Sequence, residues 1–89
     1  MTYKISILAK AEDDLAWFRK NDKNSYVKCF DLVRAIADEQ REGIGKPERL
    51  KYFEGKVFSR RVSQEDRMVY TIYEKEEEID ISSFKGHYE

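Results

Sequence analysis

The sequence is poor in the residues that cross-link or interrupt a chain. It contains one cysteine, one proline and four glycines among its 89 residues. Because Cys29 is alone, an internal disulfide is excluded, which fits a reducing compartment. No repeat, linker or low-complexity stretch divides the chain. A chain of this length builds one core, so we expect a single domain over residues 1–89.

Long hydrophobic runs are also missing. The apolar residues near the N-terminus are interrupted by Lys4 and Ser6, a pattern that indicates a half-buried strand and not a signal peptide. No segment approaches the ~20 consecutive apolar residues that a membrane-spanning helix needs. The sequence therefore predicts a cytoplasmic protein that has no membrane partner.

The motifs of several enzyme classes are absent as well. The chain has no glycine-rich phosphate loop, no nucleophile elbow and no cysteine or histidine spacing typical of a zinc site. We therefore expect neither a metal ion nor a cofactor. Any catalysis must then come from scattered acidic, basic and cationic side chains.

Charged residues are abundant but unevenly distributed. The chain has 17 basic and 18 acidic residues and a net charge of −1. Residues 43–73 hold seven basic and four acidic residues, whereas residues 74–89 hold two basic and six acidic ones. Salt screens charges beyond about 8–10 Å, so a phosphate that approaches the protein is attracted or repelled by the local excess of charge and not by the net charge. The positive segment is either an ordinary solvated strand face or a nucleic-acid-binding surface.

The first half of the chain predicts one strand and two helices. Residues 3–7 alternate between apolar and polar side chains, as a strand does. Apolar residues then recur at helical spacing over residues 11–18 and again over residues 26–37, with a polar interruption at 21–25. We expect the second helix to end near Gly43, a residue suited to a helix C-cap.

The second half predicts strands in hairpin order. Three strands are expected over residues 57–62, 67–73 and 78–84, and a short edge strand over residues 49–53. Strands that follow one another through tight turns pair in antiparallel fashion. The sequence therefore predicts an α+β fold in which both helices pack on one face of a twisted antiparallel sheet.

Three places along the chain could hold catalytic groups. Glu48 follows Pro47 where a loop enters a strand, Arg61 and Arg67 flank a hairpin turn, and His87 lies near the C-terminus. Each has a simpler interpretation, as an exposed glutamate, a salt-bridged arginine or a frayed terminal histidine. Strand register decides whether the two arginines meet: direct pairing puts them on one face, and a slip of one residue separates them.

Four short motifs resemble the Txe/YoeB toxins, a branch of the RelE-like superfamily. They are G-K-P-E-R-L-K at residues 45–51, F-S-R-R-V at 58–62, D-R-M-V-Y at 66–70 and H-Y at 87–88. The motifs occur in the family's order and at similar spacing. Residues 1–44 match only as a pattern of one strand and two helices. The resemblance implies the RelE-like α+β fold.

This resemblance also implies a function. Members of the family are toxins of type II toxin–antitoxin systems, endoribonucleases that cleave messenger RNA in the decoding site of the ribosome. A neighbouring antitoxin of the YefM kind is expected to cover the catalytic face, and such toxins can also pair as homodimers. Two alternatives stay open, namely an inactive RelE-like module that binds an antitoxin or RNA, and a toxin that cleaves free RNA.

The family's site residues transfer only to the positions that match its motifs. Glu48 resembles the general base, Arg67 the phosphate-binding arginine, His87 the general acid and Tyr88 the adjacent terminal tyrosine. RNA contacts are expected from four further basic residues: Lys46, Lys51, Arg60 and Arg61. These residue types suit cleavage through the ribose 2′-hydroxyl, which needs a base, an acid and a cation that binds the phosphate.

Two features depart from the family's pattern. Members of the family tend to be basic, whereas the isoelectric point of this chain is near 5.9. The excess of acidic residues lies in Glu74–Asp80, a turn and strand that can face away from RNA. Glu89 also extends the chain beyond the terminal tyrosine. A carboxylate near a histidine favours the protonated imidazolium, which is the form that a general acid needs.

Overall fold

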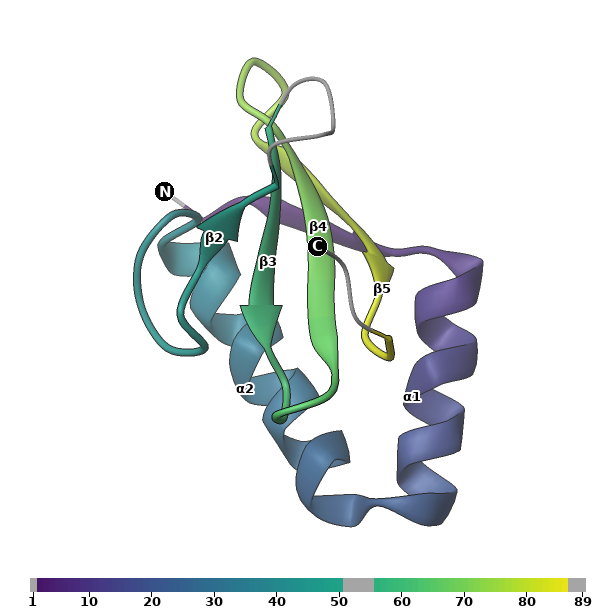
Figure 1. The fold of residues 1–89 in the computed structure, drawn as a ribbon. Coiled ribbons are helices and arrows are strands. Elements are labelled where there is room, and N and C mark those ends of the chain that lie inside the picture. Colours follow the sequence, from purple (N-terminus) through teal and green to yellow (C-terminus); the bar gives the residue numbers. More distant parts are fainter. Residues whose placement is uncertain (1, 51–55, 87–89) are drawn as a thin grey trace.

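The computed structural model describes residues 2–50 and 56–86 as one strand, two helices and four further strands (Figure 1). The candidate site residues Lys51, His87 and Tyr88 therefore lie outside the described residues, as does most of the expected edge strand. The elements are β1 (Lys4–Ile7), α1 (Ala9–Asn21), α2 (Lys23–Asp38), β2 (Glu48–Arg49), β3 (Val57–Arg61), β4 (Arg67–Tyr73) and β5 (Glu78–Ser83). The expected α+β class is confirmed.

The strands form one five-stranded sheet in the order β1-β5-β4-β3-β2. The pairs β2–β3, β3–β4 and β4–β5 are antiparallel, as their hairpin order predicts. β1 instead runs parallel to β5, so the sheet is mixed, and the expectation of a wholly antiparallel sheet was wrong on this point. The reason is that β1 leads into two helices and not into a tight turn, so no hairpin sets its direction.

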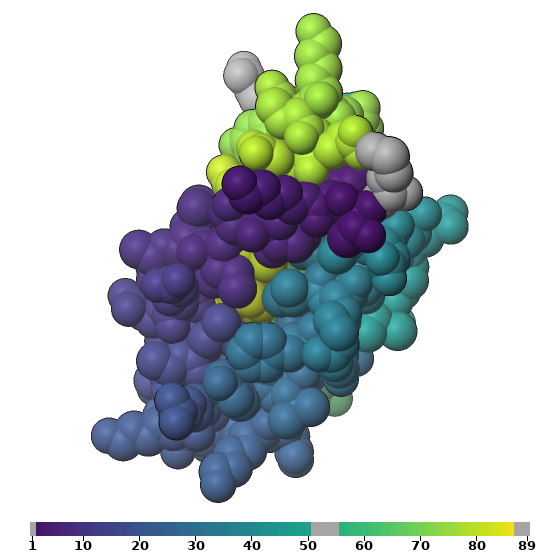
Figure 2. All heavy atoms as spheres, turned by 180° about the vertical axis from the view of Figure 1, so that it is seen from behind, coloured from purple at the N-terminus to yellow at the C-terminus, as the bar shows by residue number. Residues whose placement is uncertain are grey.

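Both helices cover the same face of the sheet, which Figure 2 shows from behind with β1 crossing above them. Only Asp22 separates α1 from α2, and its carboxylate accepts hydrogen bonds from Ser25 N at 3.1 Å and Ser25 Oγ at 2.8 Å. These bonds hold the pKa of Asp22 below its ordinary value and cap the N-terminus of α2. No helix among the described residues is both long and apolar enough to cross a membrane.

Alternation along the strands divides the sheet into a covered face and an open face. The covered face and the helices bury one continuous apolar core, to which belong Phe18, Cys29, Leu32, Ile36, Phe58, Met68, Tyr70, Ile72, Ile79, Ile81 and Phe84. Burial raises the pKa of the Cys29 thiol to about 12, so this cysteine serves packing and not reactivity. On the open face, the described residues form only a small apolar cluster, made of Leu50, Val57 and Val69. Functional side chains therefore have room on the open face.

Candidate functional site

A buried arginine organises the loop that leads to Glu48. Arg60 is fully buried, and its Nη2 donates hydrogen bonds to the carbonyl oxygens of Glu39 at 2.6 Å and Glu42 at 2.8 Å. Its Nη1 donates to the carbonyl of Ile44 at 3.3 Å, and its Nε donates to Tyr70 Oη at 3.0 Å. Arg60 thus has an internal role in place of the RNA contact expected from the sequence.

The same contacts explain where α2 ends. The helix stops at Asp38, short of the expected end near Gly43, because the carbonyl groups of Glu39, Glu42 and Ile44 bind Arg60 instead of continuing the helix. Tyr70 supports this arrangement, since its hydroxyl donates to the carbonyl of Gln40 at 2.7 Å. Burial raises the pKa of Tyr70, which keeps that hydroxyl protonated and able to donate.

Gly45 fixes the end of this loop against β3. Its carbonyl accepts a hydrogen bond from Arg61 N at 2.6 Å, and its φ of +85° lies in the left-handed region that favours glycine. A Cβ atom at this position would come within 2.7 Å of Leu32 Cδ2. Only glycine allows so close an approach, and it brings the chain alongside β3 just before Glu48.

The strand register places Glu48, Arg61 and Arg67 on one face. Glu48 pairs with Ser59, and Arg61 pairs directly with Arg67. Because Ser59 and Arg61 are two residues apart on β3, their side chains point to the same side. Cross-strand partners have Cβ atoms about 4.5–5.5 Å apart, and diagonal neighbours such as Glu48 and Arg61 lie roughly 7–8 Å apart. The register left open by the sequence is therefore the one that brings these side chains together.

The paired arginines create a local excess of positive charge. Arg61 is exposed and Arg67 is half-buried. The ion pairs Lys10–Asp14, Arg34–Asp31, Arg41–Glu74 and Lys56–Glu74 of the described residues lie elsewhere. Like charges directly opposite one another on a sheet destabilise it. An anion bound between the two guanidinium groups would remove that repulsion, and a phosphate offers oxygens that match their planar donors.

Unpartnered polar atoms gather on the same face. In the part of the chain that the structure describes, three buried side-chain atoms lack a hydrogen-bond partner: Arg67 Nη1, Ser59 Oγ and Ser83 Oγ. Ser59 and Ser83 both pair with Val69, from opposite sides of β4, two residues from Arg67. Buried donors without partners are rare in native proteins and call for an explanation such as a ligand. Their position supports an anion site centred on Arg67.

The chain end that leads to His87 is held beside Arg67. The carbonyl of Gly86 accepts from Arg67 N at 3.0 Å, and Gly86 N donates to Asp66 Oδ1 at 3.0 Å. One residue earlier, Lys85 N donates to Asp14 Oδ2 at 3.1 Å. His87 follows Gly86 in the sequence, so these bonds fix the position of the residue that directly precedes the candidate general acid.

Asp14 and Asp66 were missed by the sequence analysis. Asp14 accepts from Phe84 N at 2.9 Å as well as from Lys85 N, and Lys10 Nζ lies 2.8 Å from the same carboxylate. A signal for Asp14 exists, because it falls on the buried stripe of α1, three residues after Ala11 and four before Phe18. An acidic residue in such a position needs partners. Asp66 carries no comparable signal, since acidic residues are common in turns.

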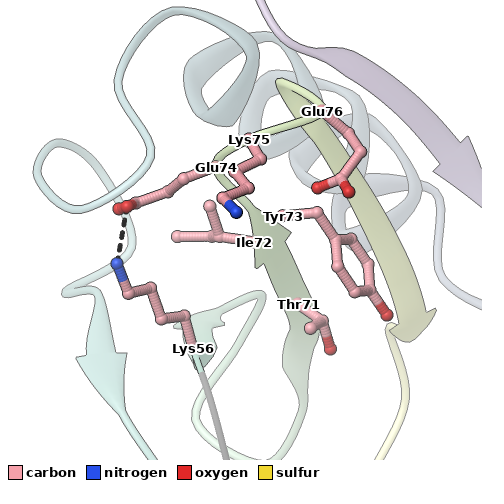
Figure 3. A pocket seen from close by; sticks show the side chains of 7 residues that line it. All are labelled: Lys56, Thr71, Ile72, Tyr73, Glu74, Lys75 and Glu76. Carbon is pink, nitrogen blue, oxygen red and sulfur yellow. Dashed lines mark ion pairs between the residues drawn. The ribbon is translucent and has the colours of Figure 1, made fainter.

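A cavity elsewhere on the sheet is separate from this face. It has a volume of about 460 Å³ and is lined by Lys56 and residues 71–76 (Figure 3). Glu74 is paired there with Lys56 Nζ at 2.6 Å and with Arg41, and these hydrogen bonds hold the pKa of Glu74 below its ordinary value. Tyr73 ends the strand that Arg67 begins, so about 20 Å of β4 lies between them. The acidic turn is thus remote from the arginine pair.

Comparison with known proteins places these features in a family. Residues 8–88 match the family model of the YoeB-like toxin of bacterial type II toxin-antitoxin systems. Toxin YoeB of Synechocystis sp. is 38% identical over 86 residues, which cover 97% of this chain and 98% of that protein. The YoeB dimer from Staphylococcus aureus superposes with a TM-score of 0.85 at 38% identity, and the match covers 99% of this chain and 100% of that chain. The YoeB–YefM complex from the same organism gives a TM-score of 0.81 at 36% identity, with coverage of 99% and 100%.

Proposed function

Because the chain belongs to the family of YoeB-like toxins of bacterial type II toxin-antitoxin systems, we propose that it is a metal-independent endoribonuclease that cleaves messenger RNA on the ribosome. The observation that carries this proposal is the direct pairing of Arg61 with Arg67 on the same open face as Glu48. Two guanidinium groups that form no ion pair with another described residue lie beside an exposed carboxylate, and together they supply the phosphate-binding and proton-accepting groups that RNA cleavage requires. Within the described residues no cluster of His, Cys, Asp or Glu could hold a metal ion.

The chemistry follows from the roles of these groups. Glu48 removes the proton of the ribose 2′-hydroxyl, and the resulting oxygen attacks the adjacent phosphorus. The bond between phosphorus and the 5′-oxygen breaks, and His87 supplies the proton that this oxygen takes up. The products are a 2′,3′-cyclic phosphate and a free 5′-hydroxyl. Arg67 binds the non-bridging oxygens, where charge accumulates during the attack. Tyr88, the residue after His87 in the sequence, is assigned to the same catalytic group.

Other basic residues hold the RNA around this centre. We assign Arg61, Lys46 and Lys51 to contacts with backbone phosphates, which position an RNA without reading its sequence. Arg60 is left out of this set because it is buried. The place of action is the decoding site of the ribosome, in the cytoplasm.

An antitoxin is proposed as the regulatory partner. A relative with 36% identity forms a YoeB–YefM complex, and another with 38% identity is a dimer. We propose that an antitoxin of the YefM kind covers the open face of the sheet and so blocks access to Arg67. Because the second of these relatives is a dimer, we also propose that two copies of this chain can pair.

Expression of the protein without an antitoxin is expected to stop growth and translation. The test compares the parent chain with Glu48→Gln at matched soluble levels, by growth, pulse labelling of new protein and primer-extension mapping of transcripts. The parent chain should arrest growth and leave cut messages, and the variant should do neither. Normal growth with soluble parent protein would instead support the inactive binding module.

Asp66→Ala is expected to lower the rate of single-turnover cleavage by about 10-fold or more, because small misplacements of a reacting group have large effects on rate. The substitution removes the carboxylate that holds Gly86 N, while the RNA-binding arginines stay in place. Asp66→Asn keeps an acceptor and should recover most of the rate. Glu65→Ala, at the exposed neighbouring position, is the control. Cleavage by Asp66→Ala at the parent rate would show that this anchor does not serve the site.

A further inference from the structure

A basic concavity lies beside Arg61, one member of the arginine pair. Its volume is about 290 Å³, and it is lined by Lys28, Lys46 and Arg61 together with Gly45, Val62, Ser63 and Gln64. Ligand sites begin at about 300 Å³, so this space suits one group of a ligand and not a whole nucleotide. No acidic residue is among the described residues that line it.

The three cations come from separate parts of the fold. Lys28 belongs to α2, Lys46 to the loop before β2, and Arg61 is the last residue of β3. The hydrogen bond from Arg61 N to the carbonyl of Gly45 joins the loop to the strand at this point. Lys46 has a φ of +50°, a strained conformation that is unusual for a residue other than glycine. Such strain is characteristic of functional positions.

Lys28 is the residue of this group that the sequence did not single out. It is half-buried, and the carboxylate nearest to it along the helix, that of Asp31 three residues on, is paired with Arg34. Asp66, in the adjacent turn, is engaged by Gly86 N. Three cations in one concavity with no carboxylate among the lining residues repel one another, and a bound anion would relieve that repulsion.

We propose that this concavity binds a backbone phosphodiester of RNA next to the one that is cleaved. The proposal rests on the function proposed above and extends it by naming Lys28 as a contact residue. Arg61 lines the concavity and also pairs with Arg67, so one strand of RNA can reach both places. Gln64 adds a neutral amide donor that suits phosphate oxygens, whereas the Ser63 hydroxyl donates to Asp66 Oδ2 at 3.4 Å. The phosphate can belong to the messenger or to ribosomal RNA, which offer the same chemistry.

The test compares Lys28→Gln with Lys23→Gln. Lys23 is an exposed residue at the start of the same helix and does not line the concavity. One arm measures affinity for a single-stranded RNA with a 2′-deoxy substitution at the cleavage position, and the other measures affinity for ribosomes without messenger. Both are titrated over a range of salt concentrations, and thermal melting verifies that each variant is folded.

Loss of one phosphate contact should reduce the slope of log K against log salt by about 0.7 on single-stranded RNA. We expect this reduction for Lys28→Gln, with a several-fold weaker affinity, and neither change for Lys23→Gln. A change in the RNA arm identifies the messenger as the source of the phosphate, and a change only in the ribosome arm identifies ribosomal RNA. Equal slopes and affinities for the two variants in both arms would overturn the proposal. Cleavage by the parent chain, measured separately, tests the proposed function itself.

Discussion

Glu48→Gln should lower the single-turnover rate of messenger cleavage on a programmed ribosome by about 10²-fold or more. Glutamine preserves the size and hydrogen-bonding oxygen of the side chain but cannot take the proton of the 2′-hydroxyl. Glu48 is exposed on a two-residue edge strand, so its replacement should change the free energy of unfolding by no more than about 0.5 kcal/mol. Ribosome binding, measured in parallel, should stay near the parent value and so assign the loss to chemistry.

Two further variants sharpen this experiment. Glu76→Gln neutralises another exposed glutamate, in the acidic turn at the opposite end of β4, and should cleave like the parent. His87→Gln removes the proposed acid and should reproduce the loss seen for Glu48→Gln. Cleavage by Glu48→Gln at the parent rate would refute the assignment of the base. If His87→Gln alone is fully active, Tyr88 or a solvent proton must serve the leaving group.

The elements of the fold could be predicted because most of them have a clear hydrophobic period. The expected strand over residues 67–73 coincides with β4, and the strand over residues 57–62 differs from β3 by one residue. The parallel direction of β1 could not be predicted, because its partner β5 lies more than 70 residues away and no turn joins them. The end of α2 depends in the same way on Arg60, a residue that is distant in sequence.

The candidate site shows the same limit at the level of single residues. Arg60 and Arg61 are adjacent and chemically identical, yet one is buried and the other exposed. Strand alternation distinguishes the two arginines, since Arg60 is in phase with Phe58 and Val62, two residues that belong to the apolar core. By contrast, Asp14 acts through hydrogen bonds from the backbone of Phe84 and Lys85, far along the chain, and belongs to no motif.

The burial of Arg60 leads to a strong prediction for stability. Arg60→Ala should reduce the free energy of unfolding by about 3 kcal/mol or more, a large part of the 5–15 kcal/mol typical of a domain. The substitution opens a cavity in the core and leaves the carbonyl groups of Glu39 and Glu42, together with Tyr70 Oη, without their donor. The midpoint of urea unfolding should therefore fall sharply.

Arg61→Ala is the matched control, because it removes the same side chain from the next position on the strand. Arg61 is exposed, so its loss should change the free energy of unfolding by no more than about 0.5 kcal/mol while weakening RNA binding. The folded fraction of Arg60→Ala should also cleave more slowly, because the loop that delivers Glu48 loses its internal support. If the two variants unfold at the same urea concentration, Arg60 does not hold that loop, and the placement of Glu48 must depend on the pairing of β2 with β3 alone.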